Sequence, residues 1–227
     1  GSCEEGQGRG SRPGGGGRLM PDAIDAFRAQ TGASDANIAD LQAFLVMLTE
    51  ANEVMNLVGP DTLPDFWNRH AWDSAQLLSL APEANTWADL GAGAGFPGVV
   101  LAILLKERPG AHVWLIDSLG KRCRFLQTIV DTLDLPATVV NGRAEEQAIT
   151  VDVVTARAVA AMEKLLGYAQ PYFQRGAKGL FLKGEKAEAE LKEARRVWQF
   201  EAELTVSRSD PRGRIVYVRS LRRARPA

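Results

Sequence analysis

The apolar residues near the start of this chain recur at helical spacing. From Ser34 to about Asn52 they return every three or four positions, at Ile38, Leu41, Leu45 and Leu48. This spacing predicts an amphipathic helix with Ser34 as its N-cap. A second helix is predicted from about Pro64 to Leu80. We expect the two helices to form an N-terminal cap on the rest of the chain.

From Trp87 to Gly184 the pattern changes to short apolar runs that alternate with helical stretches. Strands are predicted at 86–90, 113–117, 137–141, 151–155 and 179–183, and helices at 97–107, 119–133, 161–173 and 186–197. Two further extended runs, 201–208 and 214–219, flank the turn residues Ser209–Gly213. The alternation predicts an α/β fold with a mostly parallel, Rossmann-like sheet, and the last two runs predict an antiparallel pair at its end.

A glycine-rich turn follows the first of these strands. Glycines stand at 91, 93, 95 and 98, and residues 93–98 match the dinucleotide pattern G-x-G-x-x-G. Asp117, at the end of the next strand, lies where an acid would accept hydrogen bonds from both ribose hydroxyls. On its own, this turn favours an enzyme that binds a nicotinamide cofactor.

Three features favour S-adenosylmethionine instead. Asp89 precedes the glycines, where it can accept a hydrogen bond from the turn or a ligand amine but would repel a pyrophosphate. The closing antiparallel pair is typical of S-adenosylmethionine methyltransferase domains. The only histidines, His70 and His112, are not at strand ends that face the cofactor. An NAD-dependent oxidoreductase remains the alternative enzyme.

Composition limits the size of the fold and the classes of protein to which the chain can belong. The 227 residues are 45% hydrophobic with a formal net charge of -1, enough for one buried core with an appendage. The apolar run Val99–Leu105 is too short for a membrane span, no signal segment is visible, and the expected location is the cytoplasm. Cys3 and Cys123 offer no disulfide framework, and we predict no metal site.

Charge is distributed unevenly. We expect the Gly-rich residues 1–19 to be a tail that does not fold, with Met20 as the natural start. The cap is expected at 20–82, the α/β domain at 83–221 and a basic tail at 222–227. A basic cluster also stands at Lys121, Arg122 and Arg124. The basic clusters alone would suit a non-enzymatic RNA-binding protein, which is a third hypothesis.

Several motifs then occur together in a characteristic order. They are Asn56-Leu57, Arg69-His70-Ala71-Trp72-Asp73-Ser74, Asp89 to Gly98, Asp117-Ser118-Leu119-Gly120-Lys121-Arg122, Asn141-Gly142-Arg143-Ala144-Glu145-Glu146, Ala156-Arg157-Ala158 and Leu182-Lys183-Gly184. Over about residues 40–220 the chain resembles the RsmG (GidB) family. The resemblance implies a class I methyltransferase fold with a seven-stranded sheet. It also implies methyl transfer from S-adenosylmethionine to N7 of a guanine in bacterial 16S ribosomal RNA, with S-adenosylhomocysteine as the product.

The resemblance also implies which positions bind the cofactor. Matched residue by residue, these are Gly91, Phe96, Ala144, Glu145 and Arg157, to which the ribose argument adds Asp117. The arginine would be costly to bury unpaired, so we expect it to have a partner or a ligand. On the cap, a structural network that pairs Asp73 with Arg69 or His70 is favoured over substrate contact.

Guanine N7 carries a lone pair and no proton, so no residue is predicted as a general base. Candidates for positioning the RNA are Arg143, Lys183, Lys121 and Arg122. The RNA or a small-subunit assembly particle is the expected partner, and the protein is expected to act as a monomer. Val58 and Ile215 replace polar residues that are common in the family, which leaves the roles of these positions open.

Overall fold

The computed structural model describes residues 21–224, so the predictions for residues 1–19, Met20 and the last three residues lie outside it. Its centre is a seven-stranded sheet in the order β3-β2-β1-β4-β5-β7-β6. The strands are β1 (Thr86–Leu90), β2 (His112–Asp117), β3 (Ala137–Asn141), β4 (Val153–Arg157), β5 (Lys178–Lys183), β6 (Trp198–Val206) and β7 (Arg214–Arg223). Strands β1 to β5 pair in parallel, whereas β7 is antiparallel to both β5 and β6. The predicted sheet is confirmed.

The closing strand pair is longer than predicted. Strand β7 continues to Arg223, and Arg222 and Arg223 pair with Gln199 and Trp198 of β6. The predicted boundary of a basic tail at residue 222 is therefore wrong for these two arginines. The pairing continues because Leu221, opposite Phe200, packs against the core beneath α6 and α7.

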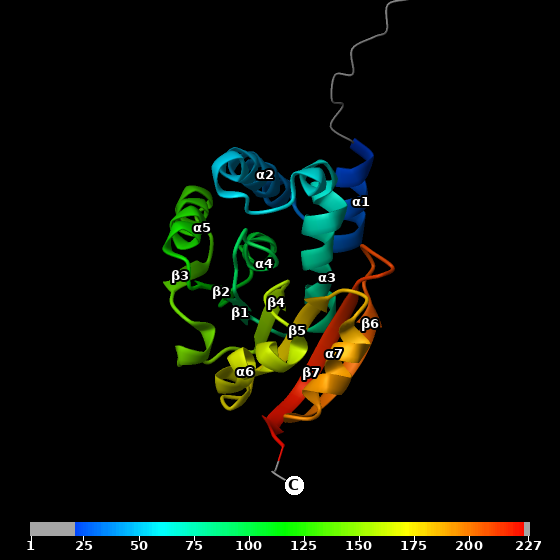
Figure 1. Cartoon of the computed structure of the whole chain (residues 1–227). Helices are drawn as coiled ribbons and strands as arrows, with labels where there is room; N and C mark the ends of the chain where they lie inside the picture. The colour runs from blue at the N-terminus through cyan, green and yellow to red at the C-terminus, as the bar shows by residue number, and fades with distance from the viewer. Residues whose placement is uncertain (1–20, 225–227) are drawn as a thin grey trace, which may run out of the picture.

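Helices cover both faces of the sheet (Figure 1). Helices α4 (Gly98–Leu104) and α5 (Gly120–Leu133) pack on one face, where α2 (Asp35–Met55) and α3 (Asp73–Leu80) contact α4, and α1 (Pro21–Thr31) contacts residues 67–72. Helices α6 (Met162–Phe173) and α7 (Ala187–Ala194) lie on the other. Each strand alternates between the two layers, as when Trp87 faces the first core and Ala88 the second.

The cap contains more than the two predicted helices. Ser34 is the N-cap of α2, as predicted, and forms a capping box with Asn37. Helix α1 was missed because Ile24 and Phe27 are its only large apolar residues. The second predicted helix is three short pieces: a 3₁₀ turn at Pro60–Asp65, a π-helical stretch at Trp67–Trp72 and α3. A proline inside the first turn has no N–H to donate, which favours a short turn over a continuous helix.

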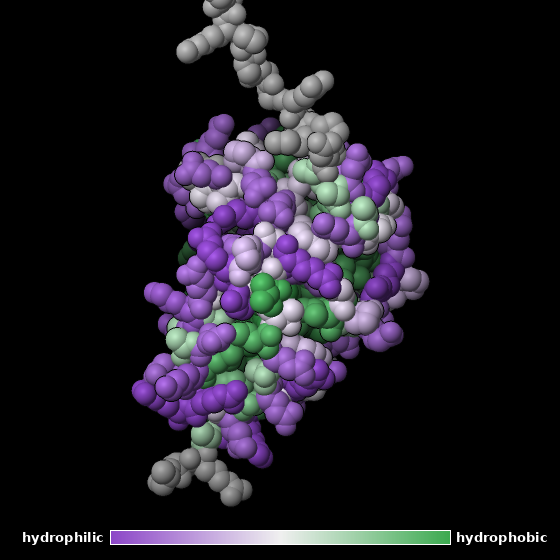
Figure 2. Space-filling view, turned by 90° about the vertical axis from the view of Figure 1, so that its right-hand side faces the viewer, coloured by the Kyte–Doolittle hydropathy of each residue, from purple (hydrophilic) through white to green (hydrophobic). Residues whose placement is uncertain are grey.

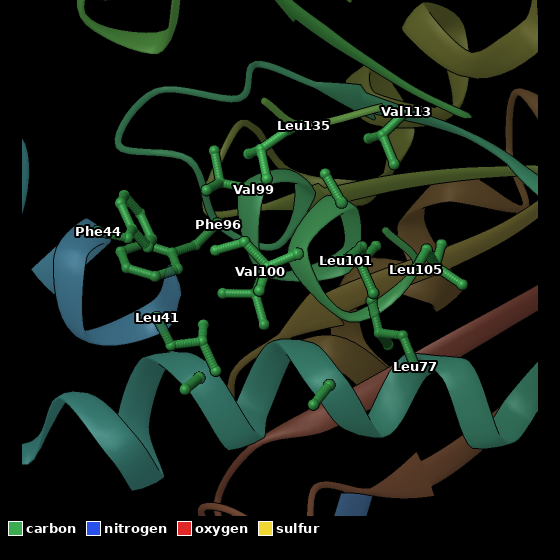
Figure 3. Close-up of a cluster of buried hydrophobic side chains, with 14 of the residues drawn as sticks. Leu41, Phe44, Leu77, Phe96, Val99, Val100, Leu101, Leu105, Val113 and Leu135 are labelled. Atoms are coloured by element: carbon green, nitrogen blue, oxygen red, sulfur yellow. The ribbon is translucent and has the colours of Figure 1, made fainter. Parts of the chain in front are cut away.

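The cap and the α/β domain share one hydrophobic core. Residues Gly98 to Ile103 of α4 are all buried. In Figure 3 this helix is enclosed by apolar side chains from the cap, the sheet and the loop after α5, including Leu41, Phe44, Leu77, Val113 and Leu135. A helix that is apolar all round must be buried on every side. The cap therefore completes the core that fixes α4 and the glycine turn before it.

The surface is mostly hydrophilic on the side that Figure 2 shows, with an apolar area near its middle. Among the exposed large apolar residues is Val206, which is 53% exposed at the end of β6. No helix within residues 21–224 is long and apolar enough to cross a membrane.

Candidate functional site

The glycine turn after β1 is pinned to the neighbouring strand. The backbone N–H groups of Gly91 and Ala92 both donate to the carbonyl of Ile116, at 2.8 and 2.9 Å. Gly91 has φ +70°, and a Cβ there would lie 2.8 Å from Cγ2 of Val159. Both facts require glycine. The sequence predicted Gly91 as a cofactor contact, and nothing in the sequence indicated that Val159 after β4 would be its neighbour.

The side chain of Asp89, in β1, caps the start of α4. Its carboxylate is fully buried, and Oδ2 accepts a hydrogen bond from the N–H of Gly98 at 2.8 Å. A dinucleotide cofactor places its pyrophosphate at this helix N-terminus, where the N–H groups point at the anion. Here a carboxylate already holds that position, so the structure argues against a dinucleotide. Burial raises the pKa of Asp89 to about 7.

Asp117 ends β2 beside the turn and is 4% exposed. Its Oδ1 accepts a hydrogen bond from the N–H of Leu119 at 2.8 Å, just before α5, and its Oδ2 accepts one from the N–H of Gly93 at 3.0 Å. The Arg122 guanidinium stands 3.6 Å from Oδ2. Each carboxylate oxygen can accept a second hydrogen bond, so this fixed group can still bind two ribose hydroxyls.

These residues border a cavity of about 490 Å³ at the carboxyl ends of β1, β2 and β4. We call it the inner cavity. Its lining includes all the predicted cofactor residues, Gly91, Phe96, Asp117, Ala144, Glu145 and Arg157. Ala144 and Glu145 lie in a 3₁₀ turn, where the carbonyl of Ala144 accepts a hydrogen bond from the hydroxyl of Tyr172 at 2.9 Å. Sequence reasoning missed Tyr172, which comes from α6.

Arg157, at the end of β4, is held by the cap. Its Nη2 donates to Nδ1 of His70 at 2.9 Å, its guanidinium lies 4.7 Å from the ring centre of Phe96, and its Nη1 is 3.7 Å from Oδ2 of Asp73. The sequence predicted a partner for this arginine, and the structure supplies several. It also corrects the expected pairing of Asp73, whose cationic partner is Arg157 and not Arg69 or His70.

His70 is held as a neutral ring. Because its Nδ1 accepts from Arg157, its Nε2 carries the proton and donates to Oγ1 of Thr62 at 2.9 Å. The ring also stacks on Phe96 at 4.6 Å and 16°. Burial, followed by the charges of Arg157 and Arg69, lowers the pKa of His70 to about 3. Both nitrogens are committed, so His70 cannot act as a proton acceptor without breaking this arrangement.

A second cavity, of about 910 Å³, adjoins the first. We call it the outer cavity. It is lined by the cap, by the segment after β5 and by the loop between β6 and β7. The residues that line both cavities form the junction between them: Leu57, Val58, Arg157 and Ala158. Ala158 has φ +54°, a strained value for a residue other than glycine, of a kind that concentrates at functional sites.

The structure separates the residues predicted to position RNA. Arg122 and Arg143 line the inner cavity, Lys183 lines the outer one, and Lys121 lines neither. Lys183 is already paired, because its Nζ is 2.7 Å from Oε2 of Glu190 and donates to the carbonyl of Ala160 at 2.8 Å.

The two positions that depart from the family pattern lie in different parts of the structure. Val58 lies at the junction between the cavities. Ile215 is 2% exposed and belongs to the core around α4.

A Rossmann-like sheet with an antiparallel β7, together with a glycine turn that a carboxylate caps, defines the fold of class I S-adenosylmethionine-dependent methyltransferases. Solved structures share this fold. A SAM dependent methyltransferase from Aquifex aeolicus is 17% identical with a TM-score of 0.53, covering 74% of this chain and 96% of that one. The magnesium protoporphyrin IX methyltransferase of Synechocystis PCC 6803, solved with bound SAM, is 16% identical with a TM-score of 0.54, covering 83% and 99%.

Sequence comparison then gives the family. Residues 37–213 match the GidB family model, described as rRNA small subunit methyltransferase G, and the chain belongs to this family. A relative named ribosomal RNA small subunit methyltransferase G, from Caulobacter vibrioides, is 61% identical over 210 residues, covering 91% of this chain and 97% of the relative. One of the same name from Methylorubrum extorquens is 46% identical over 191 residues, covering 83% and 90%. The resemblance seen in the motifs is confirmed, and the oxidoreductase hypothesis loses its support.

Proposed function

We propose that this protein transfers a methyl group from S-adenosylmethionine to N7 of one guanine in 16S ribosomal RNA. Membership of the rRNA small subunit methyltransferase G family supports the RNA substrate. The observation that carries the choice of atom is the junction between the cavities. None of its side chains, those of Leu57, Val58, Arg157 and Ala158, can accept a proton, because the guanidinium stays protonated.

A nucleophile that reacts at this junction should therefore need no proton removed. Amines and hydroxyls lose a proton during methylation, whereas guanine N7 attacks with a free lone pair. When bound, S-adenosylmethionine supplies an electrophilic methyl group, and the electron pair of the broken carbon–sulfur bond stays on sulfur to give S-adenosylhomocysteine. The methylated guanine carries the positive charge. The protein's task is then to hold the two reactants in line.

The inner cavity has groups that suit this cofactor. The glycine at position 91 lets the turn lie against the Val159 side chain, and Asp117 provides acceptors for two ribose hydroxyls. Phe96 and Arg157 lie toward the cap side, and Ala144 and Glu145 lie on the turn after β3. Since one chain forms both cavities, we propose that it acts as a monomer, in the cytoplasm where ribosomal subunits are assembled.

The test uses the purified protein with radiolabelled S-adenosylmethionine. The substrates are small subunits, and separately naked 16S RNA, both from a strain that lacks this enzyme. We expect one labelled N7-methylguanine, mapped by borohydride and aniline cleavage followed by primer extension. Comparing the two substrates shows whether the assembled particle is required. Label at another atom, at another base, or in neither RNA would refute the proposal. Calorimetry with S-adenosylhomocysteine against NADH separates it from a nicotinamide enzyme.

A further inference from the structure

We propose that the outer cavity binds one unpaired nucleotide of the RNA, with its base inserted as far as the junction and its phosphates held by Arg69 and Lys186. This inference rests on the function proposed above and assigns that function a substrate site. Its first support is geometric. Reacting atoms must approach to about 3–3.5 Å for methyl transfer. With the cofactor in the inner cavity, the base has to reach it through the junction.

The size of the outer cavity limits what can enter. A volume of about 910 Å³ is that of a pocket for a small ligand, not of a groove for a duplex. A base inside a stacked helix cannot reach such a site, so the nucleotide must be unpaired or splayed out. At the junction, Leu57 and Val58 of the cap offer apolar surface, and Ala158 after β4 offers no more than a methyl group.

Hydrogen bonds within the protein fix the part of the outer cavity that is formed by α3 and the loop between β6 and β7. Oδ1 of Asp73 accepts hydrogen bonds from the hydroxyls of Ser207 and Ser209, at 3.1 and 2.6 Å. Oε1 of Gln76 accepts one from the N–H of Arg208 at 2.9 Å. These bonds tie α3 to the loop between β6 and β7. A preformed wall saves the ordering cost that RNA binding would otherwise include.

Several of the cations that line this cavity already have anionic partners. Lys183 pairs with Glu190 at 2.7 Å, and Arg157 pairs with Asp73 at 3.7 Å. Arg212 lies 3.4 Å from a carboxylate oxygen of Asp210. In each pair the nearby carboxylate offsets the positive charge and so weakens its attraction for a phosphate.

Within the described part of the chain, three other cations that line the outer cavity have no carboxylate oxygen within 4.0 Å. Arg214 turns its Nη1 back onto the carbonyls of Pro211 and Gly213, at 2.8 and 2.9 Å. Arg69 and Lys186 are exposed, and no acidic oxygen in residues 21–224 lies within 4.0 Å of either charged group. Arg69 lies on the cap, and Lys186 follows β5, so the RNA phosphates have a cation on two separate segments of the cavity lining.

The first test measures RNA affinity as a function of salt for Arg69→Gln, Lys186→Gln and the double variant. The RNA is an unmodified 16S fragment that contains the mapped target. Losing one phosphate contact to a single strand lowers the slope of log affinity against log salt by about 0.7, so the double variant should lose about 1.4. Affinity for S-adenosylhomocysteine should stay at the wild-type value. Arg175→Gln, an exposed arginine that lines neither cavity, is the matched control.

The second test places 2-aminopurine at the target position of the same RNA. Its fluorescence rises when the base leaves the stack, so binding to the wild-type protein should brighten it, and the double variant should do so only at higher protein concentration. A double variant that matches Arg175→Gln in slope and affinity would overturn the inference, as would RNA binding without brightening. Both results are distinct from a failure of the proposed function, in which the wild-type protein transfers no methyl group to small subunits or to naked 16S RNA.

Discussion

Two buried titratable groups beside the inner cavity should give the folding stability opposite dependences on pH. Burial raises the pKa of Asp89 from 3.8 to about 7. Burial and two arginines lower the pKa of His70 from 6.5 to about 3. Both side chains are at most 4% exposed, so these shifts act on folding with little solvent screening. Variants that remove one group at a time should separate the two effects.

The signs follow from which state holds the proton. Between pH 3.8 and about 7 folded Asp89 keeps a proton that the unfolded chain has lost, so its contribution to stability falls as pH rises. Between about pH 3 and 6.5 the unfolded chain protonates His70 while the folded protein does not, so its contribution rises with pH. Each group changes the free energy of unfolding by about 1.4 kcal/mol per pH unit inside its window. In wild type the two slopes largely offset each other.

The variants are His70→Asn and Asp89→Asn. Asparagine at 70 keeps an acceptor for Arg157, and asparagine at 89 keeps an acceptor for the N–H of Gly98. From pH 4.5 to 6.5, His70→Asn should lose about 2 kcal/mol relative to wild type, because only the Asp89 slope remains. Asp89→Asn should gain about the same amount relative to wild type.

The assay is urea unfolding of the cofactor-free protein at half-unit steps of pH. A difference from wild type that does not change with pH, or that has the same sign in both variants, would refute the reasoning. The free energy of unfolding of Asp89→Asn at a single pH is also informative. Among residues 21–224, Oδ1 of Asp89 and Oγ1 of Thr155, on paired positions of β1 and β4, have no hydrogen-bond partner of good geometry. Asparagine at position 89 has no charge to bury, so Asp89→Asn should exceed wild-type stability above pH 7, where Asp89 ionises inside the core.

Three further changes test the inner cavity. Gly91→Val should abolish S-adenosylhomocysteine binding, measured by calorimetry, while the protein still folds, because the new side chain meets Val159 and displaces the turn. The control is Gly110→Val, which has a similar positive φ of +75° but nothing within 4 Å of its Cβ, and it should keep binding. Arg143→Ala should lower methyl transfer to RNA far more than cofactor affinity, and equal losses in both would remove it from the RNA side. Tyr172→Phe should lower the free energy of unfolding by about 1 kcal/mol through loss of its bond to the Ala144 carbonyl, and urea unfolding that matches wild type would count against that bond.

The sequence by itself determined the sheet and the glycine turn. The bounds of β1 and β3 match the predicted ones residue for residue, and the other strands lie within a few residues of their predictions. These features are local, because alternation of apolar residues and glycines at fixed spacing reflect backbone geometry over a few positions. Asp117 lies at the inner cavity because it ends a predicted strand, and the carboxyl ends of parallel strands meet at one edge of the sheet.

Only the tertiary structure decided which side chains surround the carboxyl ends of the parallel strands. Arg157 bonds to His70, which is 87 positions earlier, and Asp73 binds a serine hydroxyl 136 positions later. No periodicity in the sequence encodes such pairs, because they depend on how the cap packs on α4. The same packing breaks the predicted helix at 64–80 into three pieces and leaves Lys183 paired with Glu190. The local pattern therefore fixes where the cofactor turn lies, and long-range packing decides which side chains remain available around it.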